Sequence, residues 1–518
     1  MGDNDPGDTV SQKFAPYIEA LFPVSPATVA SFAQNGVNLG TDLDGDGKPD
    51  TANLTLTAKV VDFEPLDTAI GSLQRTVKTT ESLDGTIILS SNNTSVPFTS
   101  LTTTWSAPGI GVVKRTLSVT VQGQTQQQEF DIRGYSAEGT AKGLTTPIVI
   151  ASNLTAGSAF SPGPPVVASD GTHFLTIQGS AMGGLQGMLL DGNAKVIGTV
   201  NLGVGGEAGA GVSFDGTNYV VVINNNGALT LHRVTPAGAD LDAPNGISLG
   251  AATTPGGNPA VASGNGTTLI AYDVFDSTSS QHLMYGLLVD HTGQVLPVGQ
   301  IGIAVDDATH LFPRAGFDGT NYLVVWQQSP NGAEIAAQCH INAARVSPAG
   351  SVLDVPSISV SSATGGQFSP VVAFDGTNYF VAWSDLRNVQ DPNSGFFDIY
   401  GARVSPAGQV LDGSGVAVDA GGSQRRTYQT LAYTGSDYLI AWTDLGYAIS
   451  GSVGIRLARM NPDGTVTSAA GGIAVSGPPV SDAEYLYPVL TSGSQTAALL
   501  WIDTAAGEDL LTVTGYSL

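Results

Sequence analysis

One motif recurs through most of the chain and constrains the fold more than any other feature. It consists of a turn residue and a glycine followed by an apolar run, as in FDGTNYFVAW starting at Phe374. Seven copies of the dipeptide occur, at Asp170-Gly171, Asp215-Gly216, Asn265-Gly266, Asp318-Gly319, Asp375-Gly376, Thr434-Gly435 and Ser492-Gly493. Successive copies are 45, 50, 53, 57, 59 and 58 residues apart. These intervals are near the size of one four-stranded β-propeller blade, roughly 40–50 residues.

The segments around the dipeptide have the composition of β-strands joined by tight turns. Asp-Gly and Asn-Gly favour hairpin turns because glycine accepts a positive φ. The run that follows, such as Tyr322–Trp326, is apolar at nearly every position, which is typical of a strand buried on both faces. A second turn of the form Pro-x-Gly follows at Pro236–Gly238, Pro348–Gly350, Pro406–Gly408 and Pro462–Gly464.

A short apolar-x-apolar segment precedes each dipeptide and supplies a further strand. These segments are Ile148–Ile150, Val200–Leu202, Ile247–Leu249, Ile303–Val305, Ile358–Val360, Val416–Val418 and Ile473–Val475. The last repeat ends one strand short, at Leu510–Leu518, whereas Ile148–Ile150 precedes the first complete repeat. We therefore predict an all-β, seven-bladed β-propeller over residues 143–518, in which this N-terminal strand closes the last blade. Closure removes the unpaired strand edges that promote aggregation.

Composition and charge limit the environment and the partners. Among 518 residues there are 66 glycines and only 12% charged residues, which favours strands and turns over helices. The net charge is −25, and such a field repels nucleic acid and anionic membranes. A single cysteine, Cys339, excludes an intrachain disulfide, and we expect it in the core. No long apolar run or signal peptide is visible, so we interpret the chain as a mature exported protein, extracellular or at the cell surface, with a lipid anchor as an open alternative.

The residues before the propeller are expected to form two further segments. Ser25-Pro26 resembles a helix start and Gly36 a helix stop, so residues 8–36 are predicted to be helical and residues 1–40 to form a helical segment. From Leu54 to Gly134 the pattern is that of β-strands, which predicts a calcium-loop-containing antiparallel domain over residues 41–142.

An acidic loop at the start of this domain has the spacing of a calcium site. Its expected ligands are Asp42, Asp44, Asp46, Lys48 through its carbonyl oxygen, and Asp50. Alternate residues converge their oxygens on one centre, and Gly47 permits the sharp turn. The loop resembles the DxDGDGxPD calcium loops of dockerins, thrombospondin type 3 repeats and FG-GAP (VCBS) repeats. Asn53 stands where an EF-hand has a bidentate Glu, so a structural Ca²⁺ loop outside an EF-hand is the prediction, with a solvated acidic turn as the alternative.

Several polar and aromatic residues recur in register within the repeats. Trp326, Trp383, Trp442 and Trp501 are expected to pack between blades, the alternative being stacking on sugars at the mouth of the propeller. Asp385, Asp444 and Asp503 follow these tryptophans and would either hold a cation or ligand or pair with arginines. Arg233, Arg345, Arg403 and Arg459 precede the second turn and are expected to form a repeated salt bridge. Asp306, Asp307 and His310 resemble a catalytic cluster, but we interpret them as a solvated loop. No catalytic residue is assigned.

The repeats are similar to those of secreted bacterial β-propeller repeat proteins of unknown function, through FDGTNYxVxW and ARVSPAGxVLD. This resemblance implies the fold and no activity. The first hypothesis is an exported non-enzymatic binding or assembly protein whose propeller contacts another protein or a glycan. The alternatives are a polysaccharide hydrolase or lyase with a site in the central pocket, and a filament or surface-layer subunit. A deep pocket with convergent Asp, His or Arg side chains would favour the enzyme.

Overall fold

The structure is a computed structural model of the chain. The residues that it describes are 29–39, 42–68, 71–107, 111–131, 134–137, 140–144, 148–154, 165–179, 185–203, 208–225, 227–250, 255–330, 338–389, 397–421, 426–444, 454–468, 471–475, 485–494, 496–503 and 509–517.

Every regular element of the described residues is a β-strand, which confirms the predicted all-β class. The chain divides into two compact units, Met1–Thr140 and Ala141–Leu518. In the described part of the chain no helix has the length and apolar character needed to cross a membrane.

The first unit is one antiparallel sheet in which each strand pairs with the next along the chain. Its strands are β1 (Val29–Asn38), β2 (Thr51–Thr68), β3 (Gly71–Ile88), β4 (Ser95–Ala107), β5 (Gly111–Val121) and β6 (Gln124–Asp131), and β7 (Gly134–Ala137) follows them. The β5–β6 turn has positive φ at both central residues, Gln122 (51°) and Gly123 (78°), as a two-residue hairpin requires. Val37, Ala52 and Leu54 form a small buried cluster at one end of the sheet.

The helix predicted up to Gly36 is wrong over its described part. Residues 29–38 form β1, whose Ser31 and Phe32 pair with Thr57 and Leu56 of β2. Gly36 has a φ of 68° at a break in the β1–β2 register, so it marks a bulge and not a helix end. Pairing with a long neighbouring strand has overridden the local helix signals. The rest of the predicted helix, residues 8–28, lies outside the described residues.

The second unit contains seven successive antiparallel sheets. The first three are β10 (Val166–Ser169), β11 (Phe174–Gly179), β12 (Leu185–Leu190) and β13 (Val196–Asn201); β14 (Ala208–Phe214), β15 (Tyr219–Asn225), β16 (Ala228–Val234) and β17 (Ile247–Ser248); and β18 (Pro255–Gly264), β19 (Thr267–Asp276), β20 (Gln281–Asp290) and β21 (Ile301–Ala304). The next three are β22 (Ala308–Phe317), β23 (Tyr322–Pro330), β24 (His340–Val346) and β25 (Ile358–Ser361); β26 (Gln367–Phe374), β27 (Tyr379–Asp385), β28 (Asp398–Val404) and β29 (Val416–Asp419); and β30 (Arg426–Tyr433), β31 (Tyr438–Asp444), β32 (Gly454–Met460) and β33 (Ile473–Ala474).

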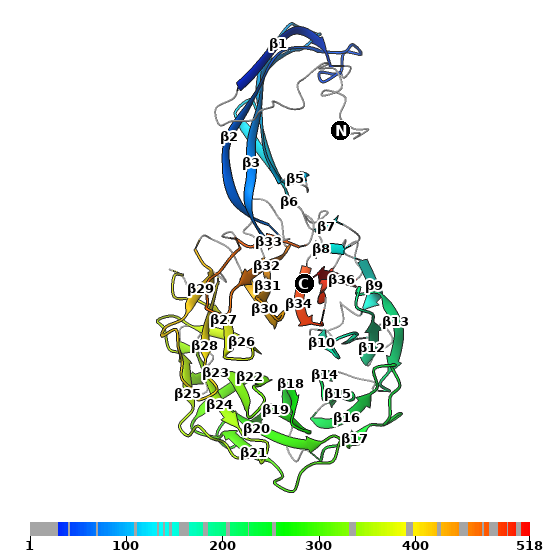
Figure 1. The fold of residues 1–518 in the computed structure, drawn as a ribbon, viewed down its shortest axis with the longest axis vertical. Helices are drawn as coiled ribbons and strands as arrows, with labels where there is room; N and C mark the ends of the chain where they lie inside the picture. Colours follow the sequence, from blue (N-terminus) through cyan, green and yellow to red (C-terminus); the bar gives the residue numbers. More distant parts are fainter. Residues whose placement is uncertain are drawn as a thin grey trace. The chain divides into compact units, whose positions relative to one another are not determined.

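The last sheet combines both ends of this unit. It contains β34 (Tyr485–Ser492), β35 (Thr496–Asp503) and β36 (Asp509–Ser517), and β36 also pairs with β8 (Thr140–Leu144) and β9 (Ile148–Leu154). Val149 lies opposite Thr512, and Ile148 lies opposite Val513. The first strands of successive sheets contact one another, and β34 also contacts β10. Figure 1 shows these sheets following one another around a ring.

The core of this unit lies between the sheets. Each large apolar cluster is shared by two sheets that follow one another, and one cluster joins Phe174 and Met188 of the first sheet to Leu500 and Val513 of the last. The repeated tryptophans belong to this core: Trp326, Trp383, Trp442 and Trp501 are at most 1% exposed. Packing between sheets is confirmed for Trp326, Trp383 and Trp442, which belong to clusters shared by two sheets, and burial excludes stacking on sugars at a pocket mouth for all four.

Two polar contacts recur from sheet to sheet, one made by the tyrosine of the repeated motif and one by the arginine that precedes the second turn. The tyrosine of the DGTNY segment donates a hydrogen bond to a backbone carbonyl of the preceding sheet, as Tyr379 does to Asn321 at 3.0 Å and Tyr438 does to Asn378 at 3.2 Å. The predicted arginine salt bridges are also present, in Arg233–Asp242, Arg345–Asp354, Arg403–Asp412 and Arg459–Asp437. In the first three pairs the two residues are nine positions apart, so each arginine ties the second turn to its own strand.

Candidate functional site

A cavity of about 690 Å³ lies where the first strands of the seven sheets converge. Residues from β10, β14, β18, β22, β26, β30 and β34 line it, together with Asp273 of β19 and His282 of β20. We call it the axial cavity. Its volume falls within the range of about 300–1,000 Å³ that is typical of ligand sites.

Four of the first strands carry the same irregularity where they line this cavity. The pairing of β22, β26, β30 and β34 with their neighbours breaks once, and each break contains a residue with a left-handed backbone. These residues are Phe312 (φ 56°), Ser369 (50°), Tyr428 (54°) and Tyr487 (53°). A left-handed backbone costs a residue with a side chain about 1–2 kcal/mol relative to the right-handed form. Such strain tends to persist where a function needs it.

The left-handed bulges place aromatic rings at the cavity. Phe312 is 49% exposed and Tyr428 is 43% exposed, although both occur in strands whose neighbouring residues are buried. The rings of Tyr428 and Tyr487 lie 4.4 Å apart between centroids, at an interplanar angle of 55°. Aromatic faces of this kind offer a stacking surface to a ligand with apolar faces.

A histidine–carboxylate pair also lines the cavity. Nδ1 of His282 lies 2.7 Å from Oδ2 of Asp273, and the Asp273 side chain is buried whereas that of His282 is 30% exposed. A carboxylate at Nδ1 fixes the tautomer in which Nε2 is the basic nitrogen. Gly257, which also has a left-handed backbone (φ 58°), lies next to Asp273, and a Cβ there would be 4.0 Å from Oδ1. A residue without a side chain therefore leaves space over the pair.

Asp273 occupies the same strand position as two of the aspartates that the sequence singled out. Asp273, Asp385 and Asp444 are each the seventh residue of the second strand of their sheet. Asp385 accepts hydrogen bonds from Trp383 Nε1 at 2.7 Å and from Arg387, and Asp444 pairs with Arg456. Their predicted alternative, a charge partner for arginine, is therefore confirmed. The side chain of Asp503 lies outside the described residues.

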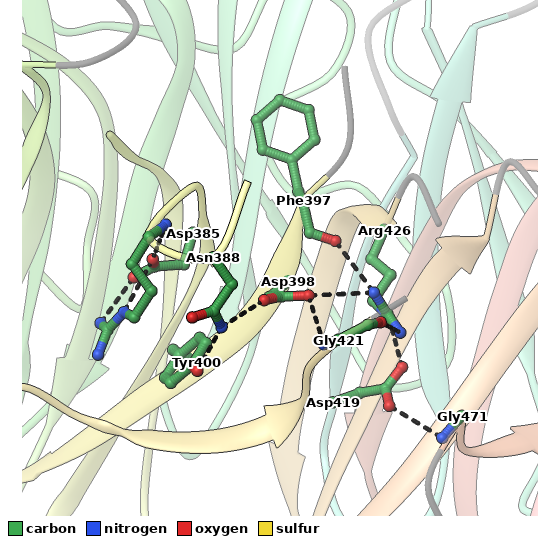
Figure 2. Close-up of polar contacts among 10 residues, drawn as sticks. Asp385, Asn388, Phe397, Asp398, Tyr400, Asp419, Gly421, Arg426 and Gly471 are labelled. Carbon is green, nitrogen blue, oxygen red and sulfur yellow. Dashed lines mark hydrogen bonds and ion pairs between the residues drawn. The ribbon is translucent and has the colours of Figure 1, made fainter. Parts of the chain in front are cut away.

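A buried ionic network around Arg426 joins two adjacent sheets (Figure 2). Arg426 of β30 lies between Asp419, at 2.5 Å, and Asp398, at 3.2 Å, and all three side chains are at most 4% exposed. Asn388 donates to Asp398 at 2.8 Å, and the backbone N–H groups of Gly421 and Gly471 donate to Asp398 and Asp419. Each carboxylate oxygen of the two aspartates thus accepts a hydrogen bond, so this network fastens adjacent sheets and leaves no oxygen for a ligand.

Arg314 differs from the residues at its position in the other bulged strands. It is the first paired residue after the bulge in β22, where β26, β30 and β34 have Val371, Thr430 and Val489. All four line the axial cavity. Arg314 donates to the backbone carbonyl of Pro313 at 2.8 Å, and among the described residues no carboxylate pairs with it. Burial lowers the pKa of Arg314, which remains a cation at neutral pH.

His310, which was predicted to lie in a solvated loop, is part of a strand. It lies in β22, is fully buried, and its ring packs edge-on against Trp326 at 5.8 Å between centroids. Its Nε2 lies 2.8 Å from Asp306, whose side chain is 62% exposed. Burial lowers the pKa of His310 and outweighs the neighbouring carboxylate. The interpretation as a solvated loop is therefore wrong for His310, which belongs to the core.

In the first unit, the acidic loop between β1 and β2 gathers its carboxylates. One oxygen each from Asp42, Asp44 and Asp50 lie within 4.8 Å of one another. Asp46 does not join this group: its Oδ1 accepts hydrogen bonds from Ser90 Oγ at 2.9 Å and from the N–H of Lys48 at 2.8 Å. The carbonyl oxygen of Lys48 lies 3.5 Å from Ser90 Oγ.

The loop backbone has the sharp turn that the sequence predicts. Gly45 and Gly47 have φ angles of 79° and 86°, and both donate to the Asp42 carboxylate at 2.6 Å. Hydrogen bonds from Ser91 lower the pKa of Asp44, which keeps this carboxylate ionised. The geometry is therefore compatible with a hard cation held by Asp42, Asp44 and Asp50.

No family model matches the chain, and no curated protein matches it. Among solved structures, the chain resembles a polysaccharide lyase with 9% identity over 74% of this chain and 94% of the lyase, at a TM-score of 0.44. An α-L-arabinofuranosidase from Lactobacillus brevis shows 9% identity over 50% of this chain and 89% of its own, at a TM-score of 0.32. An exo-1,5-α-L-arabinanase from a bovine ruminal metagenomic library shows 8% identity over 52% and 96%, at a TM-score of 0.32.

The hypothesis of a non-enzymatic binding or assembly protein, and with it the inclination against an enzyme, has to be corrected. The criterion that separates the two functions is a central pocket with convergent Asp, His or Arg side chains. The axial cavity has Asp273, His282 and Arg314 in its lining. The solved structures named above are likewise enzymes that act on glycans, although similarity at this level does not assign an activity to this chain.

Sequence reasoning did not find these three residues. Asp273 was missed because β19 begins at Thr267, directly after Gly266, whereas β27 begins at Tyr379, three residues after Gly376. Counting from the dipeptide therefore does not align Asp273 with Asp385. The available signal was internal: Asp273 comes at the end of the apolar run Leu269–Tyr272, as Asp385 and Asp444 come at the end of theirs.

Proposed function

We propose that this chain is a polysaccharide-active enzyme, a hydrolase or lyase, with its active site in the axial cavity. The observation that supports this most is the Asp273–His282 pair in the cavity lining. Asp385 and Asp444 stand at the same strand position in two other sheets, and each pairs with an arginine in a structural contact. Asp273 instead pairs with a histidine, which exchanges protons near neutral pH, and such a pair is suited to acid–base catalysis.

The proposed framework is a seven-bladed propeller closed by the pairing of β9 with β36. Three observations support it: the seven sheets in chain order, the contact of β34 with β10, and the antiparallel β9–β36 register. A ring of this kind places one strand from every blade around a common axis. The convergence of seven first strands on one cavity is what such a ring would produce.

The remaining lining residues favour a sugar ligand. Phe312, Tyr428 and Tyr487 present aromatic faces, and the apolar faces of sugar rings stack on such surfaces. The general base would be His282, oriented and stabilised in its protonated form by Asp273. In this arrangement the rings position the chain of sugars, and the histidine exchanges a proton with it.

His173 provides a matched control for testing this proposal. It pairs with Asp170 through Nδ1 at 3.1 Å, and the exposed fractions of the two side chains, 32% and 6%, nearly equal those of the cavity pair. His173 does not occur in the cavity lining. The test is the release of reducing ends from a panel of plant and algal polysaccharides by the wild type, His282→Gln and His173→Gln. We expect a loss of about 100-fold or more in kcat for His282→Gln alone, and equal losses in both variants would contradict the assignment.

We also propose that the acidic loop binds one calcium ion through Asp42, Asp44 and Asp50, with a structural role. The convergence of three carboxylates and the two left-handed glycines support this. An extracellular location, with a glycan as the partner, is part of the same proposal, because loops of modest affinity fill where calcium is about millimolar. Isothermal titration with Ca²⁺ tests it, and a failure of Asp42→Asn/Asp44→Asn to weaken binding would refute it.

A further inference from the structure

Resting on the proposed function, we infer that the axial cavity recognises the carboxylate of an acidic, uronate-containing polysaccharide through Arg314 and cleaves the chain by β-elimination. The first observation is that the residue at the position of Arg314 differs between the repeats. At the position of Arg314, three other bulged strands have valine or threonine. A residue whose only role was to line a ring of strands would be small and apolar, as Val371 and Val489 are.

Arg314 is a cation without a counter-charge in the described structure. Arg426, a buried arginine of the same unit, lies between two aspartates. Arg314 instead donates to the carbonyl of Pro313, and burial lowers its pKa. Taking a guanidinium out of water is unfavourable unless an anion joins it. A carboxylate on the ligand would provide two acceptors that match the guanidinium fork.

The cation and the histidine pair lie on strands that contact one another. β22, which carries Arg314, contacts β18, β19 and β20, and the last two carry Asp273 and His282. All three side chains line the same cavity. A uronate bound with its carboxylate at Arg314 therefore has a basic nitrogen within the same site.

This arrangement suits elimination better than hydrolysis. Hydrolysis by the usual route needs two carboxyl groups that flank the bond, and among the described lining residues Asp273 is the one carboxylate, already committed to His282. Elimination needs a base and a cation that stabilises negative charge on the substrate carboxylate. His282 and Arg314 provide these two functions.

The elimination step balances within the substrate and His282. Nε2 of His282 removes the proton from the carbon next to the carboxylate, and Arg314 stabilises the charge that develops on the carboxylate oxygens. The electron pair of that C–H bond becomes a carbon–carbon double bond to the adjacent ring carbon. The bond from that carbon to the glycosidic oxygen breaks, its electron pair stays on the oxygen, and the oxygen leaves as a hydroxyl after taking the proton from His282.

The net charge of the chain predicts how salt affects the reaction. A charge of −25 repels a polyanion at long range, whereas Arg314 acts locally. At 0.15 M ionic strength the screening length is about 8 Å, so moderate salt removes the repulsion first. KM for a polyuronate should therefore fall as salt rises from about 0.01 to 0.15 M.

The test compares each acidic polymer with its own neutral form. Polygalacturonate and alginate are incubated with the wild type, alongside carboxyl-reduced samples of the same polymers and neutral arabinan. Unsaturated products are followed by their ultraviolet absorbance, and total cleavage is followed by reducing ends. We expect unsaturated products from an acidic polymer and a rate at least about 10-fold lower from its reduced form, the loss of one charged hydrogen-bonded contact.

The matched variants are Arg314→Val, which introduces the residue of the neighbouring repeats, and Arg456→Gln, which alters an arginine outside the cavity lining. We expect Arg314→Val to lose about 10- to 100-fold in kcat/KM on the acidic polymer and to unfold at an equal or higher temperature. Arg456→Gln should keep its activity.

Cleavage of arabinan or of the carboxyl-reduced polymers at a rate equal to that of the acidic ones would overturn the inference and leave the proposed function standing. Products without a double bond would overturn elimination in the same way. If no polymer is cleaved, both fail. The wild-type comparison decides the substrate class even if a variant does not fold.

Discussion

The left-handed aromatic residues at the axial cavity give the most direct test of whether strain is kept for function. Phe312, Tyr428 and Tyr487 have φ angles of 56°, 54° and 53°. The test uses two triple variants, one with glycine at all three positions and one with alanine. Both variants lose the same rings and nearly the same buried area. The difference in their free energies of unfolding therefore isolates the backbone.

The expected difference follows from two opposing effects. A left-handed backbone costs alanine about 1–2 kcal/mol and costs glycine nothing. Glycine loses more conformational entropy than alanine on folding, and this reduces the advantage of the glycine variant by roughly 0.5–1 kcal/mol per position. The balance is about 0.5–1 kcal/mol per position, or about 2 kcal/mol for the three in favour of glycine. With an unfolding entropy of about 2.1 cal/mol/K per residue over Ala141–Leu518, this raises Tm by roughly 2–3 °C.

The assay is differential scanning calorimetry of the two triple variants, with polysaccharide binding measured on the same samples. A control pair at Tyr433, which lies in β30 beyond the bulge and is not left-handed, should reverse the order and make alanine the more stable. We expect both triple variants to lose binding. An alanine variant as stable as the glycine variant would show that these backbones carry no strain, and the link between strain and function would fail.

Three further outcomes are expected. In the wild type, Ca²⁺ at 100 times its Kd should stabilise the first unit by about 2.7 kcal/mol and raise its Tm. Asp44→Ala should abolish this increase in Tm. An unchanged response of the variant to chelator would count against the loop. Deleting Leu510–Leu518 removes the strand that pairs with β9, so the second unit should lose cooperative unfolding by circular dichroism; a soluble, cooperative product would refute closure. Burial raises the pKa of Asp354, but hydrogen bonds from Arg345 outweigh it and lower the pKa below its ordinary value. The Arg345–Asp354 pair therefore contributes its full stabilisation above about pH 4 and loses it as the pH falls through the lowered pKa of Asp354. Asp354→Asn should lower the free energy of unfolding by about 1–3 kcal/mol at pH 7 and by less in acid, as measured by urea unfolding.

Much of the second unit is readable from sequence because its signals are local and repeated. Asp375-Gly376 specifies a turn by backbone geometry alone, and the run after it is apolar because both faces of the strand are covered. In three of the four repeats with this arginine, its partner lies nine residues later, as Arg345 and Asp354 show. These inferences need only the nearest neighbours in the chain.

The site and the first strand were not readable for the opposite reason. A left-handed bulge at Tyr428 has no sequence signature, since tyrosine has no preference for that conformation. His282 acquires its role from Asp273, and both acquire theirs from first strands that converge from distant parts of the chain. Val29–Asn38 is a strand because β2 lies beside it, which local helix signals do not reveal.

In a repeat protein, however, comparing the repeats with one another separates structural residues from candidate functional ones. The residues that hold the sheets together recur in register, and those that deviate lie at the axial cavity. Arg314 stands where other bulged strands have a valine or threonine, and Gly257 leaves a space beside the Asp273–His282 pair that a side chain would fill. Each deviation costs stability relative to the repeated residue, through an unpaired cation or added backbone freedom. Both costs fall on adjacent sheets that line one cavity, and this is the physical reason to look for catalysis there.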